Sequence, residues 1–437
     1  MKVDVANGAQ DVMERRIRIE DWFRGLPVVT RLDVAPDAVT IICRGLSGNV
    51  TAIRDAEGLV LCDTGAIDTC ETVLASVREW EPDAPIRAVI YTHGHFDHVA
   101  GMPLIDRDAE ARGAPRPVLV AHENAPRRFE RYRRTGPFNE RINIRQYSRP
   151  GFRWPTEFRE PDVLVRKSHR LAEVGEAIEL RHGMGETDDH MWVWLPKRRL
   201  AVIGDFYTWA APNAGNPQKA QRYVIEWAET LRAIVAAGPE VVVPGHGPVI
   251  FGREAIASVL GDIAAWLESL HDQTLALLNS GIRPSDIPHR VAPPEHLSDL
   301  PWLKNNYDDP EFVVRAMCRL YGGWWDGNPA HLKPAPDDEL AREIALAAGG
   351  ADRLARRADS LAKEGRLRLA CHFAEFAAQA APSDLGAQAT RARIYDQRLK
   401  AESGQMAKGV FRDAIQEAES RIASPGGELR ARSVKMK

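Results

Sequence analysis

The stretch Thr92–His98 constrains this chain more than any other part of it. Its sequence, Thr-His-Gly-His-Phe-Asp-His, holds four potential metal ligands within six residues: His93, His95, Asp97 and His98. Imidazole nitrogens and carboxylate oxygens suit Zn²⁺ and other divalent transition metals. The stretch follows an apolar run, residues 86–91, that predicts a buried strand. His93 and His95 alternate and can point into one site, while Asp97 and His98, one turn later, can serve a second ion nearby.

A histidine-rich stretch can also be a plain surface loop, so the rest of the chain has to supply further ligands. Candidates follow in three later loops: Glu186, Asp205 and His246. Each of them follows a predicted strand or lies between two. The spacing therefore favours one convergent site over an exposed loop.

Composition limits the class of protein. The 437 residues allow about two or three domains. With 44% hydrophobic residues, 27% charged residues and a net charge of −3, the chain is globular and gives no electrostatic reason to expect nucleic acid or membrane as a partner. No apolar run is long enough to span a bilayer, and residues 1–8 lack the apolar core of a signal peptide.

The five cysteines are scattered, and none forms a CxxC pair. They are Cys43, Cys62, Cys70, Cys318 and Cys371. This usage predicts reduced thiols that pack in the core of a cytoplasmic protein. Cys62 precedes Asp63 at a predicted strand end near the site, and packing is the favoured interpretation for it as well.

The first 253 residues predict a catalytic domain with many short strands. Turn residues separate apolar runs at 39–43, 50–54, 59–63, 86–91, 117–121, 177–181, 190–195, 199–204 and 240–243. Helices are expected at 14–23, 68–79, from 99 onward and at 217–236. These elements predict two β-rich halves with helices outside, a layered αββα sandwich of the α/β class. Its ligand loops would come from corresponding strand ends.

Residues 123–160 alternate arginines with aromatic residues, for example Arg131, Tyr132 and Trp154. The pattern is too irregular to predict one helix. One interpretation is a cationic flap over an anionic substrate. The other, which we favour from the sequence, is a solvated helix face followed by a loop that contacts a partner.

The character of the chain changes at residue 254. Apolar residues recur at helical spacing up to Gly281, which predicts a helix that stops there. A proline-rich stretch, 282–335, and an alanine-rich helical stretch follow. We expect an all-α domain over 254–424 and a disordered tail over 425–437.

Three of these motifs resemble those of the metallo-β-lactamase superfamily over roughly residues 36–255. They are His93-x-His95-x-Asp97-His98, the strand end Gly204-Asp205, and Pro244-Gly245-His246-Gly247. Glu186 stands where most members have a histidine, which resembles the branch of zinc-dependent alkylsulfatases. Residues 254–420, with the run Tyr321–Ala330, resemble the helical dimerisation domain of that branch. We find no counterpart of its sterol-carrier-like C-terminal domain, nor of the secretion signal of some members.

The resemblance implies two Zn²⁺ ions per chain, although other divalent transition metals would also suit the ligands. It implies His93, His95 and Glu186 on one ion and Asp97, His98 and His246 on the other, with Asp205 between the two. His182 and His190 are alternatives for the role of Glu186, or are histidines that only pack beside the site.

Two such ions would share a bridging water and lower its pKa, which gives hydroxide as the nucleophile. They would also polarise the scissile bond and stabilise the charge of the transition state. Asp97 can orient the water. The resemblance implies a small, anionic ester as substrate, a sulfate ester first, and a homodimer.

Substrate recognition is less well defined by the sequence. The resemblance implies that Asn213 and Tyr321 contact the sulfate group, although Asn213 can equally be a turn residue and Tyr321 a packing residue. Gln218, with Lys219 and Arg222 nearby, stands at the offset of a family arginine, and glutamine cannot make the bidentate contact of a guanidinium. This difference favours the alternative of another bond: a lactone, thioester, phosphoester or lactam. A metal-binding scaffold without enzymatic activity is the further alternative.

Overall fold

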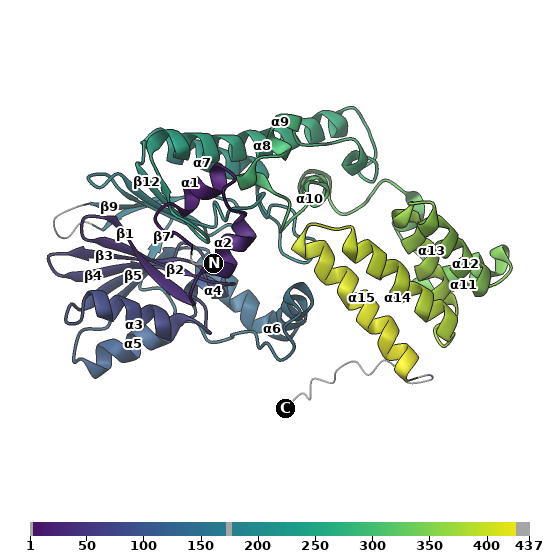
Figure 1. Cartoon of the computed structure of the whole chain (residues 1–437), viewed down its shortest axis with the longest axis horizontal. Coiled ribbons are helices and arrows are strands. Elements are labelled where there is room, and N and C mark those ends of the chain that lie inside the picture. The colour runs from purple at the N-terminus through teal and green to yellow at the C-terminus, as the bar shows by residue number, and fades with distance from the viewer. Residues whose placement is uncertain (1–2, 172–176, 425–437) are drawn as a thin grey trace.

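The computed structural model of the chain describes residues 3–171 and 177–424, so the tail predicted at 425–437 lies outside it. Two β-sheets pack face to face in its N-terminal part, and helices cover their outer faces (Figure 1). A separate group of helices follows on one side. The predicted αββα sandwich with a helical region after it is confirmed.

The first sheet has seven strands in sequential order. They are β1 (Val29–Ala35), β2 (Ala38–Cys43), β3 (Val50–Asp55), β4 (Gly58–Cys62), β5 (Ile86–Ile90), β6 (Val118–His122) and β7 (Val163–Val165). Strands β1 to β4 pair antiparallel, whereas β4, β5, β6 and β7 pair parallel. Parallel neighbours end at the same edge of a sheet. The segments that follow β4 and β5 therefore start side by side.

The second sheet has six strands in the order β13-β12-β11-β10-β9-β8. They are β8 (Ser168–Leu171), β9 (Ile178–His182), β10 (Met191–Leu195), β11 (Leu200–Gly204), β12 (Val241–Pro244) and β13 (Ile250–Phe251). β11 and β12 are parallel. Asp205 follows β11 and His246 follows β12, so both leave the sheet at one edge.

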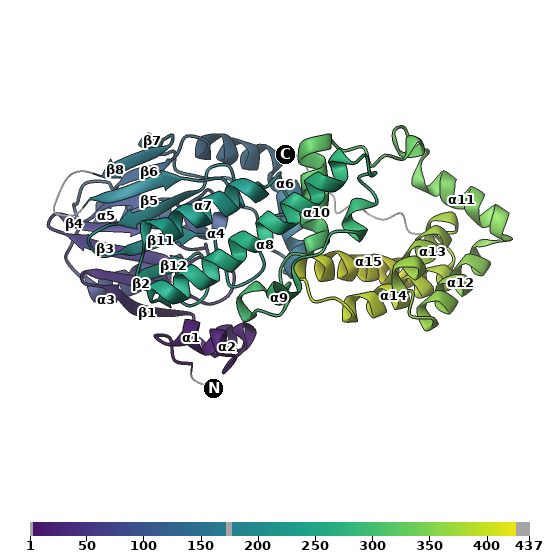
Figure 2. The same cartoon turned by 90° about the horizontal axis from the view of Figure 1, so that it is seen from above.

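Helices cover the two sheets from outside. α3 (Cys70–Trp80) and α5 (Met102–Ala111) lie over the first sheet, and α7 (Val224–Ala237) and α8 (Arg253–Asn279) lie over the second (Figures 1 and 2). Strands β2, β4, β10 and β11 are buried at every position. Such continuous apolar strands are typical of sheets that are covered on both faces.

Residues 123–160 contain one long helix, α6 (Ala125–Tyr147), which the sequence did not predict. The helix is broken in the middle, because Thr135 has φ −113° and ψ 19°. Pro137 lacks a backbone N–H, so an intrahelical hydrogen bond is missing beside the break. The break explains why the sequence pattern is too irregular to predict one helix.

Other elements also differ from the prediction. The helix expected at 217–236 begins only at Val224, which leaves 217–223 as a loop. Of the helix expected at 14–23, only the second half is helical, in α2 (Ile19–Gly25); α1 (Gly8–Met13) ends before this range, and α4 (Phe96–Val99) is one turn. Strands β1, β7, β8 and β13 were missed. β7 has three residues and β13 has two, and β8, Ser-His-Arg-Leu, is too short and polar to give a periodic signal.

The C-terminal region is helical, as predicted. It contains α9 (Glu295–Ser298), α10 (Pro310–Gly322), α11 (Asp337–Ala348), α12 (Ala351–Lys363), α13 (Leu367–Ala380), α14 (Leu385–Lys400) and α15 (Gln405–Ala423). Buried residues of α8 and α10 belong to the same hydrophobic core as the sheets. The boundary at 253/254 therefore stays a prediction. Over residues 3–171 and 177–424, no helix has both the length and the apolar character needed to cross a membrane.

Candidate metal centre

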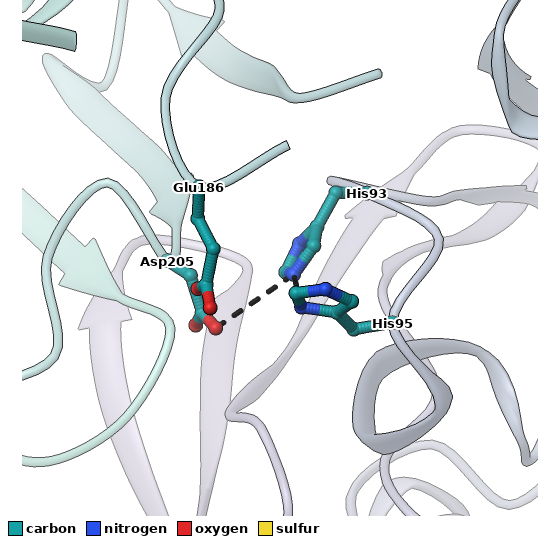
Figure 3. A group of neighbouring side chains, drawn as sticks. All are labelled: His93, His95, Glu186 and Asp205. Carbon is teal, nitrogen blue, oxygen red and sulfur yellow. Dashed lines mark hydrogen bonds and ion pairs between the residues drawn. The ribbon is translucent and has the colours of Figure 1, made fainter. Parts of the chain in front are cut away.

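The predicted ligands meet at one edge of the sandwich in two groups. The ligand atoms of His93, His95, Glu186 and Asp205 all lie within 4.8 Å of one another, and those of Asp97, His98 and His246 form a second group by the same measure. Figure 3 shows the carboxylates of Glu186 and Asp205 on one side, facing the imidazoles of His93 and His95 on the other. The two sides come from the two different sheets.

Asp205 lies between the two groups. Its Oδ2 is 3.7 Å from His93 Nε2, and its Oδ1 is 3.3 Å from His98 Nε2 and 3.4 Å from His246 Nε2. His246 Nε2 also lies 3.5 Å from Asp97 Oδ2. One carboxylate therefore reaches histidines of both groups, which is the arrangement expected of a ligand shared by two ions.

The donor set fits divalent cations. His98 Nε2 and Asp205 Oδ1 are buried and make no hydrogen bond. Buried polar atoms are rarely left unpaired, since their desolvation costs about 1–3 kcal/mol each. A cation between these atoms would satisfy both, and a mixed set of imidazoles and carboxylates suits zinc and similar metals.

Asp63 orients the second group from behind. Its Oδ2 lies 2.7 Å from His98 Nδ1, and its two oxygens accept hydrogen bonds of 2.7 Å from the backbone N–H and the hydroxyl of Thr92. A carboxylate on the far nitrogen of a ligand histidine fixes the ring and its tautomer. The sequence identifies Asp63 only as the residue at a strand end. Its position directly after a buried strand, beside the strand that leads to His93, was the available signal.

Glu186 is held by two donors. Asn213 Nδ2 donates a 2.7 Å hydrogen bond to Glu186 Oε1, and Arg222 Nη1 donates to the same oxygen and, at 2.8 Å, to the carbonyl of Asn213. Burial raises the pKa of the Glu186 carboxyl; Arg222 opposes this shift and Asp205 adds to it. The sequence identifies Arg222 only as a cation near Gln218, and its contact with Glu186 is visible only in the structure.

His182 and His190, the alternatives to Glu186, stand beside the two groups and belong to neither. His182 stacks on His122, with ring centroids 3.9 Å apart, and its Nε2 lies 3.1 Å from the carbonyl of Asp188. His190 stacks between His93 and Phe206. The geometry therefore favours Glu186.

Tyr321 is not brought to the site. It lies in the last turn of α10, is 48% exposed, and its hydroxyl lies 3.0 Å from His271 Nε2 on α8. Tyr147 at the end of α6 and Tyr307 before α10 line the cavity instead, and their hydroxyls are hydrogen-bonded to each other. The motif around Tyr321 therefore pointed to a residue that packs on α8, and the sequence did not identify this pair of tyrosines as site residues.

A cavity of about 740 Å³ opens at the metal groups. This volume is in the range of small-molecule sites. Its apolar lining includes Phe23, Leu46, Phe96, Tyr132, Phe138, Ile142, Trp154 and Trp209. Since several of these residues belong to α6 and the loop after it, the structure favours the flap interpretation of residues 123–160, which the sequence analysis had placed second.

The cations around the cavity differ in their pairing. Arg128 is paired with Asp188 and Asp189, and Arg222 with Glu186. Arg131, Lys219 and Arg319 also line the cavity, and across residues 3–171 and 177–424 no carboxylate forms an ion pair with any of these three side chains.

Two of these cations, Lys219 and Arg131, lie against aromatic rings instead. Lys219 Nζ lies 5.5 Å from the centroid of Trp154, and Arg131 Cζ lies 5.5 Å from that of Tyr132. Burial, with a further contribution from Arg222, lowers the pKa of Lys219 to about 8. The wall of the cavity therefore carries cations that have no carboxylate as an ion-pair partner among the described residues.

Comparison with known proteins gives two family matches. The metallo-β-lactamase superfamily model matches residues 43–246, and the alkyl sulfatase dimerisation model matches residues 283–421. A linear primary-alkylsulfatase of Pseudomonas sp. is 25% identical over 366 residues, which cover 78% of this chain and 69% of that protein. An (R)-specific secondary-alkylsulfatase of Pseudomonas sp. is 26% identical over 387 residues, which cover 81% of this chain but only 57% of that protein.

Solved structures agree with these matches. A double mutant of the sec-alkyl sulfatase PisA1 superposes with a TM-score of 0.79 at 25% identity, over 89% of this chain and 66% of that one. The inverting sec-alkylsulfatase Pisa1 of Pseudomonas sp. gives a TM-score of 0.80 at 24% identity, over 93% of this chain and 68% of that one. The resemblance found in the sequence is confirmed: the chain joins a domain of the metallo-β-lactamase superfamily to an alkylsulfatase dimerisation domain.

Proposed function

We propose that the protein is a dinuclear metal-dependent hydrolase that cleaves a small anionic ester, with sulfate esters as the first candidates. The observation that carries this proposal is the shared position of Asp205 between two groups of ligand atoms that line one cavity. The alkylsulfatase relatives support the reaction.

In this proposal His93, His95 and Glu186 hold one ion, Asp97, His98 and His246 hold the other, and Asp205 binds both. Two divalent ions, Zn²⁺ by preference, supply Lewis acidity and an activated water when they are bound. Asn213 and Arg222 fix the direction of the Glu186 carboxylate. Asp63 does the same for His98, so that the ligand set is organised before substrate arrives.

Asp97 is the ligand best placed for a second role. It lies next to His246 and is among the residues that line the cavity. An oxygen of this carboxylate that is not occupied by a metal can accept a hydrogen bond from the nucleophile and orient it towards the substrate. A residue in such a role must lie within hydrogen-bond distance of the group that it orients.

Recognition of the substrate rests on the two unpaired cations that lie against aromatic rings. Lys219 and Arg131 attract an anionic group, while the aromatic lining accepts an apolar body. Gln218 Oε1 accepts a 2.8 Å hydrogen bond from Arg145, so this side chain is engaged in the wall. Lysine is a point charge that does not select one oxyanion geometry. This feature favours the second candidate, a phosphoester, more than it favours a lactone, a thioester or a lactam.

We further propose a homodimer that forms through the helical region. Five large apolar side chains near the end of α10 and the loop after it are exposed: Leu320, Tyr321, Trp324, Trp325 and Leu332. Exposed apolar patches of this kind mark interaction sites. A second copy of this chain is the occupant we favour, since the patch lies within the stretch that matches the dimerisation family.

The decisive experiment measures metal content and turnover together. The purified protein and His95→Ala are compared on aryl and alkyl sulfates, phosphates, lactones and thioesters. Two ions per chain with sulfate release that the variant loses would support the proposal. Two ions with turnover of another class would support the second candidate. Bound metal without any turnover would support the metal-binding scaffold, and absence of metal would refute the ligand assignment.

A further inference from the structure

The first turn of α15 touches two segments of the cavity wall. Gln405, which itself lines the cavity, donates a 2.6 Å hydrogen bond from Nε2 to the carbonyl of Gln146 at the end of α6. The backbone N–H groups of Gln405 and Met406 donate to the carbonyls of Asn306 (3.1 Å) and Tyr307 (3.2 Å). Figure 2 shows α15 running from this point outward beside α14. The helix thus starts in the site and ends in the helical region.

A third segment of the wall, the loop between β11 and α7, is linked to α15 in two ways. Asn216 Nδ2 donates to Met406 Sδ at 3.0 Å, and Met406 is fully buried. The second link passes through Arg145, which donates to Gln218 Oε1 at 2.8 Å and to Asp413 Oδ2 at 2.7 Å. α15 therefore reaches this loop both directly and through the end of α6.

These three segments carry polar groups of the site. Tyr147 and Tyr307, whose hydroxyls meet, come from the first two. Asn213, which donates to Glu186, comes from the third. A displacement of the segments would move all three side chains relative to the ligand groups.

The fit between α15 and α6 is close at Gly409. A Cβ atom there would lie 2.8 Å from the carbonyl oxygen of Arg145 and 2.9 Å from Gln146 Cα. Real Cβ atoms do not approach backbone atoms so closely, and backbone cannot swing aside as a long side chain can. Even one methyl group at this position would push α15 away from α6.

We infer that α15 is a positioning element of the hydrolytic site. Its first two turns fix Tyr307 and the loop that carries Asn213, so the helical region serves the site as well as self-association. The consequence for turnover rests on the proposed hydrolase function, whereas the structural coupling does not.

Hydrogen exchange on the full chain tests the coupling without any assay of activity. Gly409→Ala is compared with Gly261→Ala, which lies in α8 with only a side-chain atom of Arg232 near its Cβ position, at 3.7 Å. We expect faster exchange in peptides that cover 213–223 and 302–310 in Gly409→Ala only, with the sheets unchanged. Unchanged exchange in these peptides would overturn the inference.

Kinetics then test positioning through Tyr307. We expect Gly409→Ala to lower kcat/KM at least about tenfold while the sedimentation mass and the metal content stay the same. In a Tyr307→Phe background, Gly409→Ala should lower kcat/KM by a clearly smaller factor, because the hydroxyl that it displaces is already gone. Full additivity of the two effects on kcat/KM would overturn the assignment to Tyr307.

If Gly409→Ala does not fold, Gln405→Ala replaces it in both measurements, and unchanged exchange and kinetics in that variant would refute the inference. A wild type that cleaves no ester would refute the proposed function, and hydrogen exchange would still decide the coupling.

Discussion

Asn213 donates a 2.7 Å hydrogen bond to Glu186, the one carboxylate in a position where most members of the superfamily have a histidine. Both side chains are buried. A carboxylate has more freedom to rotate and to bind in different modes than an imidazole ring that is stacked in place. The amide, together with Arg222, removes that freedom.

Asn213→Ala should therefore weaken metal binding by Glu186. We expect kcat/KM to fall about 10- to 100-fold and one of two metal ions to be lost more readily to a chelator, as is typical when a group that orients a ligand is removed. Asn279→Ala, at the exposed end of α8, is the matched control. Unchanged metal retention and activity in Asn213→Ala would contradict the role.

Asp63→Asn tests the support of the second ligand group. The amide has only one acceptor oxygen, so it cannot accept all three hydrogen bonds that the carboxylate takes from Thr92 and His98, and His98 should lose its fixed tautomer. We expect metal affinity to fall about 10- to 100-fold. Competition with a chromogenic chelator measures it, with Asp68→Asn on the surface as control; equal affinities in both variants would count against the support by Asp63.

Lys219→Met should raise KM for anionic esters about tenfold and leave neutral lactones unaffected, because it removes an unpaired cation from the wall. Lys219→Arg should keep most of the affinity. A rise in KM of the same size for neutral substrates would show a packing defect instead.

The same lysine predicts a pH dependence. Burial and Arg222 lower the pKa of Lys219 to about 8, so the cation is lost as the pH rises through that value. KM for an anionic ester should rise between about pH 7 and pH 9 in the wild type and stay flat in Lys219→Met. Parallel profiles in the two proteins would assign the pH dependence to another group.

Asp308 predicts a pH dependence of stability. Burial raises the pKa of this carboxyl to about 7, although the N–H groups of Gly215 and Asp309 donate to it. A folded-state pKa above the unfolded one gives a contribution to stability that is complete below about pH 4 and lost as the pH rises through about 7. Asp308→Asn should raise the melting temperature above pH 7 by a few degrees. An equal shift at pH 5, or the same shift in Asp299→Asn, would exclude titration of Asp308 as the cause.

Trp324→Lys tests the dimer. Trp324 is 70% exposed, and a lysine in the middle of an apolar interface would oppose association. We expect sedimentation to give the mass of one chain for this variant and of two chains for the wild type. Val28→Lys, an exposed apolar position on the sandwich, should still dimerise; a dimeric Trp324→Lys would refute the proposed surface.

The layered fold and the ligand loops could be predicted from the sequence because both are local signals. Apolar runs identify the strands, and the motif around His93 lies in one loop. Tyr307 could not be predicted, because its place at the site depends on how α10 packs against the sandwich and how α15 ties down its carbonyl. Tyr321 was predicted wrongly as a site residue, because a sequence motif does not tell which side of its helix faces the site.

The reacting centre and the walls around it come from different parts of the chain. The ligands follow strand ends of the sandwich, whereas much of the wall is built by α2, the kinked α6, the loop at 217–223 and the start of α15. Changes in those four segments can alter what fits into the cavity without touching a ligand. One catalytic apparatus can in this way be adapted to new substrates by remodelling only its surroundings.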